Sequence, residues 1–190
     1  MNPLSPKVRL WAAIVAVAAV QTAVLAWMVL DRVRLLENGR EVIVDVVPID
    51  PRSLFRGDYV RFNYDFSRVG HELLQQQPQR GRPVYVLIRQ DQAGKWQAVA
   101  ASASPPARTG AADVLLKGKA DRWWSPNRQH PLSVRYGIES YFVPEGEGRS
   151  LEKMVGEKRI SVVLAVGTDG TAAIKGILAD GKPIHREKSL

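Results

Sequence analysis

Cysteine is absent from this chain of 190 residues, so the protein has no disulfide, no thiolate nucleophile and no thiolate metal ligand. Histidine is scarce: His71, His130 and His185 lie far apart in the sequence and share no metal-ligand spacing. We therefore expect no metal site and no cofactor. The length suits one domain with a proper core and is too short for two large domains.

Acidic residues are missing from the first thirty positions, and one apolar run fills most of them. Only two of the residues from Leu10 to Leu30 are polar. As a helix this run would be about 31 Å long at about 1.5 Å per residue, which matches the hydrocarbon core of a bilayer. Trp11 and Trp27 stand near its ends, where tryptophan favours the interface. A signal-peptide cleavage site is plausible only after Ala26, inside the run, so we predict an uncleaved transmembrane helix.

The basic residues beside this span do not set its orientation, because Lys7 and Arg9 precede it while further arginines follow. Long domains, however, cross a membrane largely regardless of charge. We therefore expect a single-pass protein of the cytoplasmic (inner) membrane with its N-terminus inside and its main domain periplasmic. The expected segments are a cytoplasmic tail (1–9), the transmembrane helix (10–30), a juxtamembrane helical linker (31–40), a β-rich extracytoplasmic domain (41–182) and a C-terminal tail (183–190).

Small residues recur along one stripe of the predicted span, at spacings of four, three, four and three. A smooth stripe lets a second helix approach closely, and close packing drives helix association in lipid. The sequence therefore suggests an integral membrane partner, although alanine is also simply abundant here. The stripe consists of Ala12, Ala16, Ala19, Ala23 and Ala26.

After the span, the chain has the pattern of short strands. Asn38-Gly39 predicts the end of the helix. The following strand, from Val42 to Val47, has apolar residues on both faces except at Asp45. Alternation predicts a half-buried strand that buries Val60, Phe62, Tyr64 and Phe66. The other expected strands are 84–89, 96–101, 113–123, 132–143, 159–167 and 171–178, the last two joined by a Thr168-Asp169-Gly170 turn, with one short helix at 150–156.

About eight short strands and few helices predict a mainly β fold: an N-terminal transmembrane helix followed by one barrel- or sandwich-like domain with one or two short helices.

Net charge is +8, and most of the excess lies in residues 71–135, which hold ten bases and four acids. Four aromatic residues, Tyr85, Trp96, Trp123 and Trp124, share this region. Such a region could bind anionic envelope polymers. The simpler interpretation is that the charges form the solvated faces of several strands, because no consecutive bases concentrate them. We expect no nucleic-acid partner.

Two sequence blocks resemble a known family. GDYVRFNY, from Gly57 to Tyr64, resembles the signature of the GDYXXLXY family of bacterial membrane-associated proteins, with Phe62 in place of the usual leucine. YGIESYFVPEGEG, from Tyr136 to Gly148, is similar to the second block of that family. The resemblance implies a membrane helix followed by one extracytoplasmic module, found beside or fused to polytopic membrane proteins. It implies no established reaction.

The same blocks supply the candidate binding residues. A glycine-aspartate pair before a strand is first of all a turn that closes the corner of that strand. A carboxylate cluster would arise if the acidic glycine loop of the second block folded beside this corner, and it could bind a cation or a basic ligand, or supply an acid and a base. The alternative is a solvated acidic turn. The candidates are Asp58, Tyr59, Glu139, Tyr141, Glu145 and Glu147.

Enzyme signatures are mostly missing: the sequence has no GxSxG, Walker or HExxH motif. Ser150 and Lys153 match the S-x-x-K spacing of serine acyl-enzymes, but the SDN and KTG elements do not accompany them. We therefore expect a membrane-anchored accessory or binding module on the outer face of the cytoplasmic membrane, in contact with lipid and an integral membrane protein. Two alternatives stay open: a membrane-tethered hydrolase that uses the carboxylate cluster or the Ser150/Lys153 pair, and a binder of anionic envelope polymers.

Overall fold

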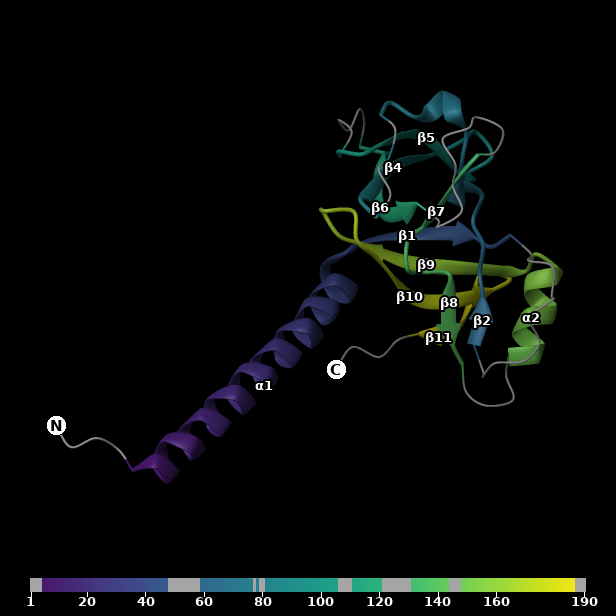
Figure 1. Cartoon of the computed structure of the whole chain (residues 1–190). Helices are drawn as coiled ribbons and strands as arrows, with labels where there is room; N and C mark the ends of the chain where they lie inside the picture. Colours follow the sequence, from purple (N-terminus) through teal and green to yellow (C-terminus); the bar gives the residue numbers. More distant parts are fainter. Residues whose placement is uncertain are drawn as a thin grey trace. The chain divides into compact units, whose positions relative to one another are not determined.

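A computed structural model describes residues 5–47, 59–76, 78, 81–105, 111–120, 131–143 and 148–186 (Figure 1). The chain divides into two compact units, and the second runs from Leu35 to Ser189.

The second unit is a β domain of three antiparallel pieces. One sheet has the order β1-β9-β10-β11, a second has the order β3-β7-β6-β4-β5, and β2 pairs with β8 as a two-stranded ribbon. The strands of the first sheet are β1 (Arg40–Asp45), β9 (Ile160–Val166), β10 (Ala172–Ala179) and β11 (Lys182–Arg186). Those of the second are β3 (Arg68–Val69), β4 (Pro83–Gln90), β5 (Trp96–Ser102), β6 (Val114–Ala120) and β7 (Leu132–Arg135). The ribbon is β2 (Tyr59–Arg61) and β8 (Ser140–Phe142), and the helices are α2 (Gly148–Gly156) with two 3-10 turns, η1 (Asp65–Ser67) and η2 (His71–Leu73).

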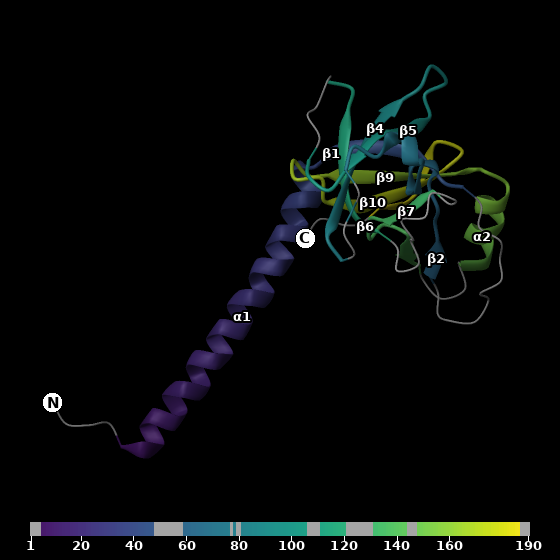
Figure 2. The same cartoon turned by 45° about the horizontal axis from the view of Figure 1, so that its top comes forward.

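The two larger sheets are joined at both sides, so the domain is a nearly closed, barrel-like structure (Figures 1 and 2). On one side, the indole Nε1 of Trp96 on β5 donates a hydrogen bond to the carbonyl of Ile43 on β1, at 2.9 Å. On the other side, the backbone N–H of Lys117 on β6 donates to the carbonyl of Gly170, in the β9–β10 turn, at 2.8 Å. The predicted mainly β fold is confirmed.

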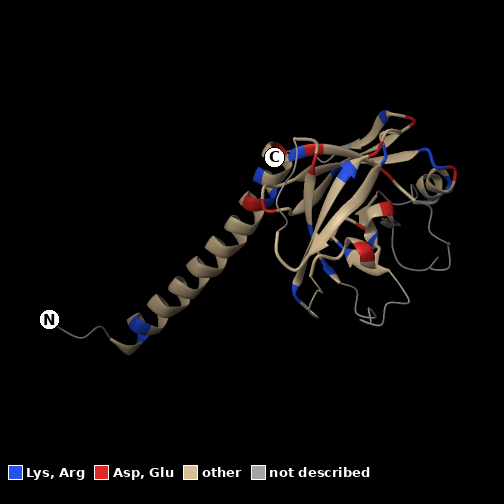
Figure 3. Cartoon of the chain, turned by 90° about the horizontal axis from the view of Figure 1, so that it is seen from above, with Lys and Arg blue, Asp and Glu red and all other residues tan. Residues whose placement is uncertain are grey.

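The first helix, α1, spans Pro6–Asn38 and covers the predicted transmembrane helix and residues 31–38 of the predicted linker. By length and composition it can cross a membrane, and none of its residues is buried within the structure. Figure 3 shows it free of charged residues along most of its length, with charges only towards its two ends. The structure of this segment is therefore compatible with an N-terminal membrane-spanning helix.

Gly39 ends α1, as the sequence predicts. Its backbone N–H donates to the carbonyl of Leu35 at 2.9 Å. A Cβ atom at this position would lie 2.4 Å from the Leu35 carbonyl oxygen and 3.0 Å from the backbone nitrogen of Val166. Because no side chain fits in that space, glycine is what allows the chain to pass from the helix directly into β1.

Several sequence predictions hold and two need correction. The β4–β5 and β9–β10 hairpins are confirmed, as is the short helix, which is α2. The single strand expected over 132–143 is wrong: β7 and β8 are separate strands, and the chain turns at Gly137, whose φ is +82°. The strand expected over Tyr59 to Phe66 is also shorter than predicted, because β2 ends at Arg61 and the 3-10 turn η1 begins at Asp65.

β11 was not expected, and it continues to Arg186, inside the segment predicted as a C-terminal tail.

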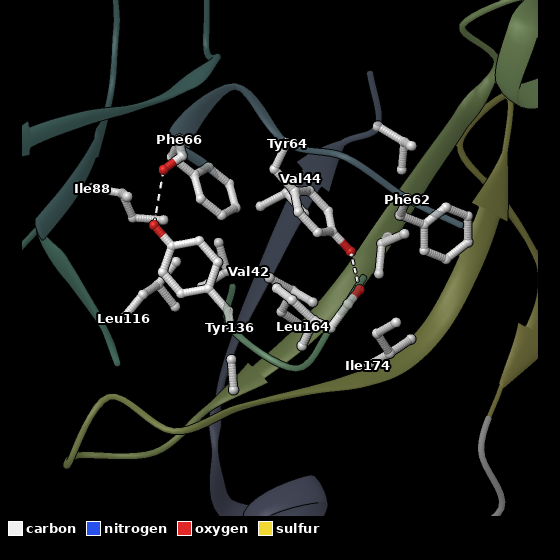
Figure 4. Packing of buried hydrophobic residues seen from close by; sticks show 14 of the residues in the cluster. Val42, Val44, Phe62, Tyr64, Phe66, Ile88, Leu116, Tyr136, Leu164 and Ile174 are labelled. Atoms are coloured by element: carbon white, nitrogen blue, oxygen red, sulfur yellow. Dashed lines mark hydrogen bonds between the residues drawn. The ribbon is translucent and has the colours of Figure 1, made fainter. Parts of the chain in front are cut away.

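The core fills the space between the sheets with aliphatic and aromatic side chains, shown in Figure 4. The four residues whose burial the alternation predicts, Val60, Phe62, Tyr64 and Phe66, all belong to it, while the intervening Arg61 is exposed. The alternation therefore identifies the buried side chains correctly even after Arg61, where the backbone is no longer a strand.

One charged group is buried in the domain wall. The side chain of Asp113, just before β6, is 1% exposed and accepts from Arg89 on β4: Nε lies 2.6 Å from Oδ1 and Nη2 lies 3.0 Å from Oδ2. Hydrogen bonding to this carboxylate, with its charge, raises the pKa of Arg89 above its ordinary value. Arg40, the first residue of β1, donates to the carbonyl of Asp113 at 2.9 Å. The Arg89–Asp113 pair thus joins β4 to the start of β6, and Arg40 links β1 to the same point.

Candidate functional site

The two family-like blocks of the sequence, about 80 residues apart, meet in the β2–β8 ribbon. The paired residues are Tyr59 with Phe142, Val60 with Tyr141, and Arg61 with Ser140. Beyond the ribbon, the backbone N–H of Phe62 donates to the carbonyl of Glu139 at 2.9 Å. The structure therefore brings together the two segments from which all six candidate binding residues were chosen.

Two buried tyrosines hold these segments in place by donating to each other's segment (Figure 4). The hydroxyl of Tyr64 donates to the carbonyl of Ile138 at 2.7 Å, and the hydroxyl of Tyr136 donates to the carbonyl of Phe66 at 2.8 Å. The ring of Phe66 lies between them, stacked on Tyr64 at 5.1 Å and edge-on to Tyr136 at 5.6 Å. We call this arrangement the tyrosine lock: Tyr64, Phe66 and Tyr136.

The lock is made of neutral donors. Burial raises the pKa of Tyr64 and of Tyr136 well above the ordinary tyrosine value, and the negative charge of Glu139 raises both further. A phenol that stays protonated keeps its O–H donor, so both hydrogen bonds persist at neutral pH.

Glu139 has a structural role. Its two carboxylate oxygens accept from the backbone N–H groups of Tyr136, at 2.5 Å, and Gly137, at 2.9 Å. These contacts close the turn between β7 and β8. Glu139 precedes β8, which begins at Ser140, so it does not share a strand with Tyr141.

The ribbon has an inner and an outer side. Directly opposed residues of an antiparallel pair lie on the same face. Val60 is buried, and the half-buried ring of Tyr141 lies 6.3 Å from the ring of His185 on β11. On the other side, Phe142 is 80% exposed, and Arg61 and Ser140 are exposed as well. We call Arg61, Ser140 and Phe142 the ribbon face.

Helix α2 supports the ribbon from the side, as Figures 1 and 2 show. Its residues Leu151 and Val155 are buried in the core, which fixes the helix against β2 and β9. The backbone that carries Phe142 is therefore held by strand pairing, by the tyrosine lock and by its neighbouring helix.

The remaining predicted site residues are not brought together by the described structure. Asp58, Glu145 and Glu147 lie outside the described residues, and so does the side chain of Tyr59. The carboxylate cluster therefore stays a prediction. Ser150 and Lys153 are exposed residues of α2, and the five alanines of the stripe are exposed on α1.

Sequence reasoning missed the tyrosine lock and the exposure of Phe142. The alternation did place Tyr64 inside, but the acceptor of its hydroxyl lies 74 residues away. Phe142 falls at the end of a predicted long strand, but its side chain is exposed because the buried phase changes between Ile138 and Tyr141. No local signal marks either feature.

The structure thus defines a class of protein in which an N-terminal apolar helix is followed by a small, nearly closed antiparallel β domain. Buried tyrosines hold the two motif segments of this domain together. The sequence model described as GDYXXLXY protein matches residues 21–177. The chain belongs to the GDYXXLXY family. Family and helix together fit a membrane-anchored protein. No curated protein and no solved structure matches this chain.

Proposed function

We propose that this protein is a single-pass accessory module of the cytoplasmic membrane, whose β domain stands on the extracytoplasmic side and binds an integral membrane protein through the ribbon face. The observation that carries the proposal is the 80% exposure of Phe142 on a ribbon built from the two family blocks. The family resemblance, which implies an occurrence beside or fused to polytopic membrane proteins, supports the choice of partner.

The ribbon face has the properties of an interaction anchor. Burying an exposed aromatic side chain releases about 25 cal/mol per Å² of apolar surface, so a phenylalanine on a protein surface is a source of binding energy. Arg61 and Ser140 flank Phe142 with a charge and a hydroxyl, which can supply the polar rim of an interface. Because the backbone is already fixed by the tyrosine lock, little conformational entropy would be lost on binding.

The alanine stripe of α1 offers a second contact with the same partner inside the membrane. Ala12, Ala16, Ala19, Ala23 and Ala26 are all exposed. Small residues at spacings of three and four let two helices approach closely enough for dispersion contacts along their length. A partner with its own membrane helices could engage the stripe and the ribbon face together.

Photo-crosslinking in intact membranes tests the proposal. A photoreactive amino acid is placed at Phe142, and in a second variant at Ala16. The matched controls are Gln92, exposed in the β4–β5 turn, and Val17, exposed on another side of α1. We expect the same integral membrane protein to be captured from Phe142 and from Ala16, and not from either control.

Changing the alanine stripe sharpens this result. The double change Ala16→Leu and Ala19→Leu should reduce capture from Phe142 several-fold, because both contacts would belong to one complex. If Phe142 captures no discrete membrane protein, or if the two positions capture unrelated proteins, the proposed partner is wrong. Turnover of a substrate by the purified protein, lost on Ser150→Ala, would instead favour the hydrolase interpretation.

Orientation has its own test, which the lack of cysteine makes simple. A single Gln92→Cys variant in intact spheroplasts should react with a membrane-impermeant maleimide before lysis. Reaction only after lysis would place the β domain in the cytoplasm and contradict the proposed topology.

A further inference from the structure

The five-stranded sheet has an apolar inner face, and basic residues gather at one end of its outer face. Its inner residues, among them Val86, Leu116 and Val134, belong to the core. On its outer face Lys119 of β6 is directly opposed to Arg135 of β7, and Arg68 of β3 is directly opposed to Ser133, two residues before Arg135 on β7. We call Arg68, Lys119 and Arg135 the basic face; all three are exposed.

Other bases of this sheet form ion pairs within the domain, whereas two residues of the basic face do not among the described residues. Arg89 is paired with Asp113, and the ammonium of Lys117 lies 3.8 Å from the carboxylate of Asp169. Arg68 and Lys119 form no ion pair with any carboxylate of the described residues.

Lys119 and Arg135 bring two cationic side chains to directly opposed positions on β6 and β7. Like charges on directly opposed residues of two strands destabilise the pair. Neighbouring strands lie only about 4.8 Å apart, so two cationic side chains share one small region of the surface. An anion bound at this position would be attracted by both side chains at once.

Chain length places the β unit close to the most abundant anions of a membrane. The apolar run ends at Leu30, and the compact β unit begins at Leu35. Five helical residues span about 7.5 Å. The headgroup layer of one leaflet is about 5–7 Å thick, being half the difference between the full bilayer and its hydrocarbon core. The β unit therefore begins where the headgroups end, and the tether keeps their effective concentration high.

We propose that the basic face binds the phosphate headgroups of anionic lipids in the membrane that holds α1. This inference uses the membrane anchor but not the integral membrane partner proposed above, so a failed crosslink at Phe142 leaves it standing. Electrostatic binding of this kind is screened by salt, because the Debye length falls from about 10 Å at 0.1 M to about 3 Å at 1 M.

The experiment uses the full-length chain in lipid nanodiscs. A single cysteine replaces Ser133, the half-buried residue of the outer face that is opposed to Arg68, and a control cysteine replaces Gln92. Discs contain phosphatidylcholine alone or with about one third phosphatidylglycerol. We expect anionic lipid to slow maleimide reaction at Ser133→Cys at least threefold at 50 mM salt, with recovery at 1 M salt and no change at Gln92→Cys.

A matched pair of triple variants separates position from net charge. Arg68→Gln, Lys119→Gln and Arg135→Gln should abolish the protection at Ser133→Cys. The control triple removes the same amount of charge from exposed residues elsewhere, and the protection at Ser133→Cys should remain. It consists of Lys95→Gln, Lys153→Gln and Lys182→Gln. Equal loss in both triples, or equal protection in zwitterionic discs, overturns the proposal. If soluble polyphosphate protects Ser133→Cys whereas anionic lipid does not, the ligand is a polymer and the proposal is likewise wrong.

Discussion

The ribbon face and the basic face lie on the same small domain but arise from different parts of the sequence. The ribbon face is formed within the two family blocks and carries an exposed aromatic ring, whereas the basic face carries cations outside both blocks. Two signature positions that the structure describes, Phe62 and Tyr64, are buried, at 2% and 1% exposure. The difference teaches that these signature residues belong to the framework that holds the ribbon, whereas the residues of the ribbon face are carried on it.

The largest effect should come from removing the framework. Tyr64→Ala deletes a buried aromatic ring that stacks on Phe66, and such changes cost about 3–5 kcal/mol of unfolding free energy. We expect thermal unfolding of the detergent-solubilised protein, followed by tryptophan fluorescence, to shift down by at least about 6 °C. Phe142→Ala is the control: an exposed side chain should change the free energy of unfolding by no more than about 0.5 kcal/mol. Equal destabilisation by both changes would remove the distinction between framework and surface.

A smaller effect should follow from removing only the hydroxyls. Tyr64→Phe and Tyr136→Phe each leave a backbone carbonyl without its donor, at a cost of about 1–3 kcal/mol in the free energy of unfolding. Because both rings contact Phe66, the double variant should deviate from additivity. Denaturant titration of the single and double variants measures the coupling. Unchanged stability in both single variants would mean that shape, not hydrogen bonding, holds the two segments.

Alkaline pH should weaken the same lock. The folded protein raises the pKa of Tyr64 and Tyr136 above the unfolded value of about 10, so the unfolded chain loses these protons first. Their contribution to stability is therefore complete below about pH 10 and falls as the pH rises above it. The slope should be shallower in the Tyr64→Phe/Tyr136→Phe variant, by up to about 2.7 kcal/mol per pH unit for two protons. Urea titrations between pH 9 and 11.5 give both slopes, and identical slopes would contradict the raised pKa values.

The smallest effect, and the only one of opposite sign, is expected on the basic face. Lys119→Thr removes the repulsion with Arg135 and places a good strand former on β6, so the free energy of unfolding should rise by a few tenths of a kcal/mol at low salt. High salt should erase much of the gain. Lys95→Thr, in the β4–β5 turn, should show no such salt-dependent gain. Destabilisation by Lys119→Thr would mean that this lysine supports the sheet.

Much of the fold could be predicted because its signals are local. The apolar run forms α1, which ends at Asn38-Gly39 as predicted. The alternation from Val60 to Phe66 correctly identifies the buried side chains. The Thr168-Asp169-Gly170 turn joins two strands as expected, with Gly170 at a φ of +89°. Each of these features depends on residues that are close together in the sequence.

The errors and omissions arise where distant segments decide the outcome. The expected strand over 132–143 is interrupted because Glu139 holds the backbone N–H groups of Tyr136 and Gly137 in a turn. β2 is short because its partner, β8, has only three residues. For the candidate site, the sequence chose the two segments that the structure does bring together, but neither the lock nor the exposure of Phe142 could be inferred from spacing alone.

The pairing of β1 with β9 has a consequence for biosynthesis. Val44 pairs with Val162, so the first strand to emerge from the ribosome waits for a partner made 118 residues later. At about 5–20 residues per second, that interval lasts roughly 6–24 s. Throughout this interval the apolar strand has an open backbone edge, which is the kind of surface that chaperones recognise and from which aggregates grow. Completion of the barrel must therefore follow almost complete translation.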